Sequence, residues 1–149
     1  MITPHFSLAE TFHTDQTAFV QQNEQEALKH MSSLTELCKL MEQVRSLLGD
    51  HPINVHSMFR SVELNAHING SATSQHCKGE ACDFDVSGLT LQEAFDKLRH
   101  SNLKWGQLLL EGHSTAGYGW LHISLGAPHR DIAKCQQVAT VQGKVFTWL

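Results

Sequence analysis

The stretch from Ser74 to Asp83 reads SQHCKGEACD. It places His76 and Asp83 seven positions apart, with Gly79 between them. Because glycine lets the backbone turn sharply, we expect His76 to lie in a loop and Asp83 to lie on a strand over residues 81–86. An imidazole nitrogen and a carboxylate oxygen are both typical zinc ligands, and they make up half of a tetrahedral site.

A third ligand is available on the short alternating segment WLHIS, residues 120–124, in the form of His122. Three protein ligands leave one position open for water, which is typical of a catalytic zinc, whereas a structural zinc recruits a fourth, often cysteine. Cys77 and Cys82 are close enough in sequence to be that fourth ligand, but alternation along a strand turns Cys82 away from Asp83. We therefore favour an open site, with a closed structural site or a polar cluster without metal as the alternatives.

The residues of this stretch carry a family resemblance: Ser74, His76, Gly79, Ala81 and Asp83 reproduce the pattern S-x-H-x-x-G-x-A-x-D. In this the chain resembles the zinc D-alanyl-D-alanine carboxypeptidases and related phage endolysins. Three further segments are similar to that family: GWLH at 119–122 to its third-ligand motif, SMFRS at 57–61 to its S-G-Y-R-S, and FSLAE at 6–10 to the start of its small phage-type branch. The match covers nearly the whole chain.

The resemblance implies a hedgehog-like zinc domain in which one Zn²⁺ is held by His76, Asp83 and His122. It also implies a peptidase that cuts a bond of the peptidoglycan stem peptide next to a D-amino acid, either as a carboxypeptidase or as an endopeptidase. The alternative from another class is an inactive, metal-stabilised binding or assembly domain of a phage particle.

Three further residues are candidates for binding the substrate. Arg60 suits a substrate carboxylate, because a guanidinium grips a carboxylate with two parallel hydrogen bonds, and its alternative role is a surface ion pair. Trp120 would wall the site and exclude water, or else pack in the core. Ser74 is the third candidate, because it is the first residue of the segment that carries His76 and Asp83.

A general base is the part of the site that departs from the better-known relatives. Those carry an acidic residue three positions before the third ligand, where this chain has Gly119, and the histidine base of other relatives is replaced by Trp120. We expect Glu111 to be the base, because it ends a strand that should pair with the strand of His122. Asp85 is the competing carboxylate. Two histidines are weaker candidates near the metal, His56 as a partner of a ligand and His113 as a loop residue approaching from outside.

The periodicity predicts one domain over residues 1–149, of α+β class, with an antiparallel sheet packed against helices. We expect a long helix from Asn23, capped by Asn23 with Glu26 and ended by Gly49. Shorter helices should begin after Ser61 and Thr90, where the latter forms a capping box with Glu93. The expected strands cover residues 53–59, 81–86, 105–111, 119–125 and 141–148, with the third and fourth forming a hairpin.

Composition narrows the partners. The net charge of −4 argues against general affinity for nucleic acid, and no apolar run is long enough to cross a bilayer. Four cysteines without a framework spacing indicate reduced thiols. We expect a monomer that acts on the stem peptide, without nucleic acid or membrane partners. No basic-then-apolar leader is visible, so we expect cytoplasmic synthesis before release to the cell wall, as for a phage-encoded enzyme.

Overall fold

The computed structural model describes residues 1–112 and 118–149. Its α-helices are α1 (Leu8–Thr11), α2 (Val20–Ala27), α3 (Met31–Leu47), α4 (Val62–His67) and α5 (Leu91–Arg99). Its strands are β1 (Ile53–Ser57), β2 (Ala81–Val86), β3 (Gln107–Glu111), β4 (Trp120–Ser124), β5 (Gln137–Gln142) and β6 (Val145–Trp148). Single 3₁₀ turns are η1 (Thr17–Phe19), η2 (Leu28–His30), η3 (Gln75–Lys78) and η4 (Ile132–Lys134). The predicted α+β class is confirmed.

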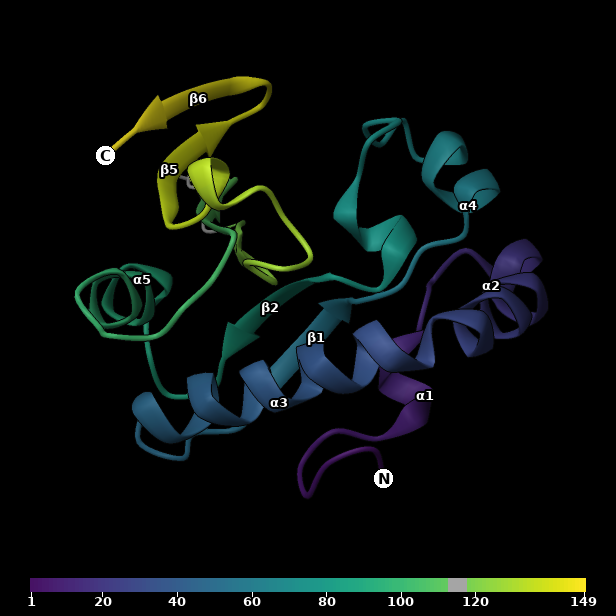
Figure 1. Ribbon diagram of the computed structural model, residues 1–149, viewed down its shortest axis with the longest axis horizontal. Coiled ribbons are helices and arrows are strands. Elements are labelled where there is room, and N and C mark those ends of the chain that lie inside the picture. The colour runs from purple at the N-terminus through teal and green to yellow at the C-terminus, as the bar shows by residue number, and fades with distance from the viewer. Residues whose placement is uncertain (113–117) are drawn as a thin grey trace.

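The strands form one six-stranded sheet in the order β1-β2-β4-β3-β5-β6, which runs from the N-terminal half of the chain to the C-terminal hairpin (Figure 1). The predicted hairpin is present as the antiparallel pair β3 and β4. All pairs are antiparallel except β3 and β5, which are parallel. The sheet is thus antiparallel as expected except at this one pair, where residues 125–136 cross back before β5 starts.

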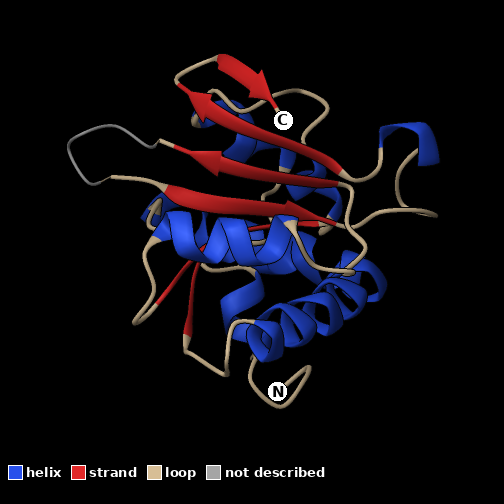
Figure 2. Ribbon diagram, turned by 90° about the vertical axis from the view of Figure 1, so that its left-hand side faces the viewer, coloured by secondary structure: helices blue, strands red, loops and turns tan. Residues whose placement is uncertain are grey.

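The two faces of the sheet have different roles. One face is covered by α3 and α5, and helices gather mainly on this side in Figure 2. The side chains buried between them include Leu34, Leu37, Met41, Cys82, Phe84, Phe95, Leu98, Leu108, Leu110, Leu121 and Ile123. Because alternate residues of a strand point to opposite faces, burying Cys82 and Ile123 turns Asp83 and His122 to the other face. The same alternation that builds the core therefore turns Asp83 and His122 away from it.

The helix ends follow local signals in the sequence. α5 begins with the predicted capping box, in which Thr90 Oγ1 accepts from the Glu93 backbone N–H and the Glu93 carboxylate accepts from the Thr90 backbone N–H. Ser61 caps α4 by accepting from the Leu64 N–H at 3.1 Å. α3 is followed by Gly49 at φ +85°, a left-handed conformation that glycine adopts without strain. No helix within residues 1–112 and 118–149 is long and apolar enough to span a membrane.

The predicted start of the long helix is wrong. Asn23 lies inside α2, fully buried, and η2 separates α2 from α3. Its amide donates to the carbonyl oxygens of Phe12 (2.8 Å) and Phe59 (3.2 Å), and its side-chain oxygen accepts from the Ser61 N–H (2.7 Å). Asn23 therefore fixes the segment after β1 that leads into the site, instead of capping a helix.

The predicted last strand, residues 141–148, is also wrong as a single element. The chain turns at Gly143, at φ +60°, and forms the antiparallel hairpin of β5 and β6. Turn residues here outweigh the apolar alternation that suggested one continuous strand. The hairpin extends the sheet beyond β3.

Candidate metal centre

His76 is positioned by a tight turn and a carbonyl. Ser74 caps η3 by accepting from the His76 N–H at 3.3 Å, and Gly79 leaves η3 at φ +67°. A Cβ on Gly79 would also lie 2.9 Å from Leu34 Cγ, so only glycine fits this close approach of the loop to α3. The His76 ring is 2 % exposed. Its Nδ1 lies 2.7 Å from the Met58 carbonyl oxygen, and because a carbonyl can only accept, Nδ1 is the donor.

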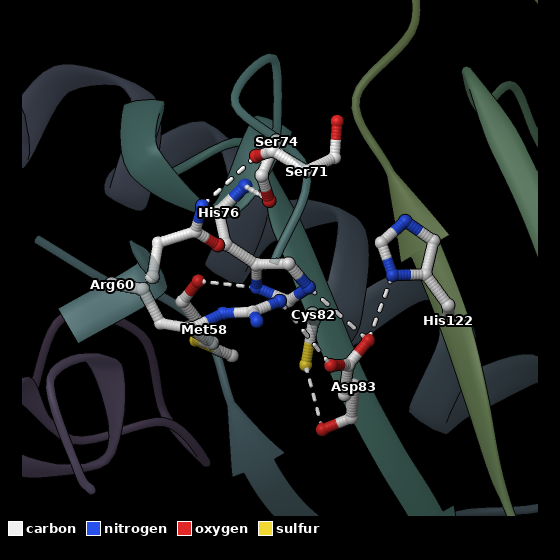
Figure 3. Close-up of polar contacts among 9 residues, drawn as sticks. Met58, Arg60, Ser71, Ser74, His76, Cys82, Asp83 and His122 are labelled. Carbon is white, nitrogen blue, oxygen red and sulfur yellow. Dashed lines mark hydrogen bonds and ion pairs between the residues drawn. The ribbon is translucent and has the colours of Figure 1, made fainter. Parts of the chain in front are cut away.

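Asp83 and His122 face each other across two neighbouring strands. They are paired in the register of β2 and β4, and His122 Nδ1 lies 2.7 Å from Asp83 Oδ1. His76 Nε2 reaches the same oxygen at 3.2 Å. Figure 3 shows Asp83 between the two imidazoles. One ligand atom from each of the three residues lies within 4.8 Å of the others.

This trio fits a zinc ion. Because Nδ1 carries the proton donated to Met58, the lone pair of the buried His76 Nε2 faces the Asp83 carboxylate oxygen at 3.2 Å, and a cation is what two such acceptors hold between them. Burial lowers the pKa of His76 and outweighs the opposing effect of Asp83. The lowered pKa favours the neutral ring, which is the form that binds metal. Burial alone would raise the pKa of Asp83, but His76 and His122 hold it well below its usual range. Two nitrogens and one carboxylate oxygen are the ligand number and type of an open zinc site.

The trio lies in a cleft of about 420 Å³ that Arg60 also lines. The Arg60 backbone N–H donates to the His76 carbonyl oxygen at 3.1 Å, so the two residues are fixed relative to each other. Its Nη2 lies 3.8 Å from Asp83 Oδ2, and its Nε is buried without a hydrogen bond. Arg60 is therefore an incompletely paired cation beside the trio and not a surface ion pair.

Comparison with known proteins agrees with this geometry. A family model described as Peptidase M15 matches residues 6–123. The chain belongs to the peptidase M15 family. A curated relative, a zinc D-Ala-D-Ala carboxypeptidase of Streptomyces albus G, is 37% identical over 57 residues. That match covers 38% of this chain and 22% of the relative, so the chain aligns with about a fifth of the relative's length. Family membership and the ligand trio together support zinc as the cofactor of this M15 family member.

Glu111 lies in the same cleft as the trio. It is paired with Trp120 across β3 and β4, two positions along the strand from the pair that contains His122, so both carboxylate and imidazole leave the same face. Burial raises the pKa of Glu111, and Asp83 adds to this, whereas His122, Arg60 and a hydrogen bond from Trp120 oppose it. A raised carboxyl pKa suits a group that takes up a proton near neutral pH.

Asp85, the competing carboxylate, is engaged elsewhere. His56 Nε2 lies 2.7 Å from Asp85 Oδ2, and Asn54 Nδ2 donates to Asp85 Oδ1 at 2.6 Å. It is not among the described residues that line the cleft. His56 therefore partners Asp85, and the possible contact of His56 with a ligand is replaced by this pair. His113, the other histidine considered, lies outside the described residues.

Of the remaining residues considered from the sequence, Ser74 and Trp120 lie at the cleft and the two cysteines do not. Ser74 and Trp120 line it, and Trp120 is 37 % exposed, so it forms a wall rather than part of the core. Cys82 is buried in the core on the opposite face of β2, and neither Cys82 nor Cys77 lines the cleft within the described residues. The cysteines are therefore not placed to close a four-ligand site.

Sequence reasoning missed several residues of the cleft, among them Gln75 and Arg130. Gln75 occupies a position of the motif where its identity carries no signal, directly before His76. Arg130 follows β4 and lies outside the segment that the family model matches. Its approach to the cleft depends on the crossover to β5, which the sequence pattern did not reveal.

Proposed function

We propose that this M15 family member is a zinc-dependent peptidoglycan peptidase that hydrolyses a stem-peptide bond next to a D-amino acid. The observation that carries the proposal is that His76, Asp83 and His122 offer three convergent ligand atoms inside a cleft that also contains a cation and a second carboxylate. These are the parts that hydrolysis of a peptide with a free carboxylate requires.

The ligands are His76 Nε2, a carboxylate oxygen of Asp83 and His122 Nδ1. Zinc bound there supplies a Lewis acid that lowers the pKa of a coordinated water and polarises a carbonyl. Met58 accepts the Nδ1 proton of His76 at 2.7 Å, and such a bond orients a histidine ligand and fixes its tautomer.

Glu111 takes the proton of the attacking water and returns it to the leaving amine. Its raised pKa and its place on the face of His122 support this role, since a base works best when its pKa approaches the working pH. Arg60 binds the substrate carboxylate through its planar fork. Trp120 covers the cleft beside Glu111 and excludes water. Ser74, which also lines the cleft, provides a further contact to the substrate.

More specifically, we propose that the protein is an endolysin-type enzyme that is encoded by a phage and acts on the bacterial cell wall. Trimming of a terminal D-alanine and cleavage within the stem peptide are the two possible reactions at this site. The resemblance of the first residues to the small phage-type branch supports the endolysin reading.

The test is the loss of turbidity of purified bacterial cell walls. Zinc-loaded protein should clear the suspension, a chelator should stop the clearing, and added zinc should restore it. A folded, zinc-loaded protein that leaves the walls of several bacterial species turbid and releases no new amino groups would favour the alternative, an inactive binding or assembly domain.

A further inference from the structure

Arg130 brings a second guanidinium to the cleft that holds the ligand trio. It comes from the crossover between β4 and β5, beyond the last residue that the family model matches. The described cleft residues thus include two arginines, Arg60 and Arg130, against the carboxylates of Asp83 and Glu111. The Asp83 carboxylate already contacts the imidazoles of His122 and His76. It therefore does not balance the positive charge of the second arginine.

The hydrogen bonds of Arg130 hold its side chain without neutralising its charge. Nη1 donates to Gln75 Oε1 (2.9 Å), Nη2 donates to Gln137 Oε1 (2.8 Å), and Nε donates to the Lys134 carbonyl oxygen (2.8 Å). All three acceptors are neutral. No carboxylate within residues 1–112 and 118–149 forms an ion pair with Arg130.

Two N–H groups of this guanidinium remain for a ligand. A guanidinium has five N–H donors, and three are used, one on each nitrogen. The unused pair therefore consists of one N–H on Nη1 and one on Nη2, and the two terminal nitrogens of a guanidinium can both donate to one carboxylate.

The backbone makes room for this arrangement. A Cβ on Gly106 would lie 2.8 Å from Arg130 Cδ and 2.5 Å from the Leu125 carbonyl oxygen, so the stem of Arg130 packs directly on a bare glycine. Gln137 is itself held, because its Oε1 also accepts from Gln107 Nε2 at 3.2 Å. A long side chain that is fixed in advance loses less entropy when it binds an anion.

We propose that Arg130 forms a second carboxylate-binding subsite, separate from Arg60, and that it selects peptides with an additional free carboxylate away from the one Arg60 holds. The inference rests on the proposed peptidase function for the nature of the ligand. The stem peptide meets the requirement wherever a residue other than its C-terminus keeps a free carboxylate. Arg130 is then a specificity-determining residue rather than only a brace for the loop of His76.

The test compares two synthetic stem pentapeptides that differ in one group. One carries the free α-carboxylate of its D-glutamate, and the other carries the amide at that position. The zinc-loaded wild type should prefer the carboxylate peptide by about 10- to 100-fold in kcat/KM, the range expected for one charge-assisted, bidentate contact. Arg130→Gln should reduce this ratio to about 1. The matched control is Arg99→Gln, which removes the same charge from α5, outside the cleft, and should keep the wild-type ratio.

A second variant neutralises the charge of Arg130 while leaving the Arg130 side chain in place. Gln137→Glu keeps an oxygen in place for Arg130 Nη2 and for Gln107 Nε2, but its carboxylate pairs with the guanidinium. It should lower the preference as Arg130→Gln does, while the zinc content and the melting temperature stay close to wild type. A residue that only braced the loop would give unchanged ratios in this variant.

The outcome separates this inference from the proposed function. If zinc-loaded protein hydrolyses neither peptide, the peptidase proposal fails, and the ratio of the two dissociation constants, measured by calorimetry on the same protein, decides on the subsite. A wild-type ratio near 1, a ratio that survives both Arg130→Gln and Gln137→Glu, or an equal loss in Arg99→Gln would each overturn the subsite.

Discussion

His76 donates its Nδ1 proton to the Met58 carbonyl oxygen over 2.7 Å, and this bond directs Nε2 toward Asp83 Oδ1, which lies 3.2 Å away. Met58 follows β1 by one residue, and the next two residues are also fixed, since the Phe59 N–H donates to Thr11 and the Arg60 N–H donates to His76. One short segment therefore orients His76, a proposed metal ligand, and anchors Arg60, the arginine proposed to bind the substrate.

The first prediction concerns the ligands. Replacing His76, Asp83 or His122 by Ala should lower bound zinc from one ion per chain to well below one, because three protein ligands are the minimum of an open site. The measurement is elemental analysis after gel filtration. His56→Ala is the matched control, because His56 binds Asp85 and not the trio, and it should keep one zinc. Full occupancy in all three ligand variants would refute the assignment.

The second prediction concerns Arg60. Arg60→Lys keeps the charge but loses the planar fork, so kcat/KM for a stem peptide should fall, and Arg60→Ala should lose roughly 2–4 kcal/mol of transition-state binding, the cost of one buried charged contact. Steady-state kinetics with zinc content as a control measure this. Wild-type kinetics in a folded, zinc-loaded Arg60→Ala protein would show that Arg60 does not bind substrate.

The third prediction compares two carboxylates by isosteric changes. Glu111→Gln should keep the fold and the zinc but lose about two to four orders of magnitude in rate, the usual contribution of a general base. Asp85→Asn should keep most of the rate, because Asp85 is held by His56 and Asn54. The reverse pattern in hydrolysis rates would transfer the role to Asp85.

The fourth prediction follows from the raised pKa of Glu111, which burial causes in the metal-free protein. The folded protein holds this proton more tightly than the unfolded chain, so the associated stability is present below the unfolded pKa of about 4.3 and is lost as the pH rises through the folded pKa. Glu111→Gln removes that loss. In zinc-free protein, the melting temperature of the variant minus that of the wild type should therefore increase from pH 3.5 to pH 7, and a constant or decreasing difference would contradict the account.

The local structure around the candidate site followed the sequence-based expectations more closely than the frame around it did. His76, Gly79 and Asp83 lie in one short segment whose turn and strand follow from local residue types, and both features are present. His122 required only the pairing of two neighbouring strands. Alternation also placed Cys82 in the core, where burial raises the pKa of its thiol.

The errors arose where long-range contacts override local signals. Asn23 resembles a helix cap, but its amide is used to join Phe12, Phe59 and Ser61, which are distant in sequence. The parallel pairing of β3 with β5 depends on an irregular crossover that has no periodic signature. Arg130 enters the cleft through that crossover, so its place could not be read from its neighbours in sequence.

The most direct test of the central claim is mass-spectrometric detection of the products from a synthetic stem pentapeptide. We predict that zinc-loaded wild-type protein releases D-alanine or a defined shorter peptide, that chelation stops the release, and that the His122→Ala variant shows none at any zinc concentration that leaves the protein soluble. An intact peptide after prolonged incubation with folded, zinc-loaded wild type, or equal cleavage by wild type and His122→Ala, would contradict it.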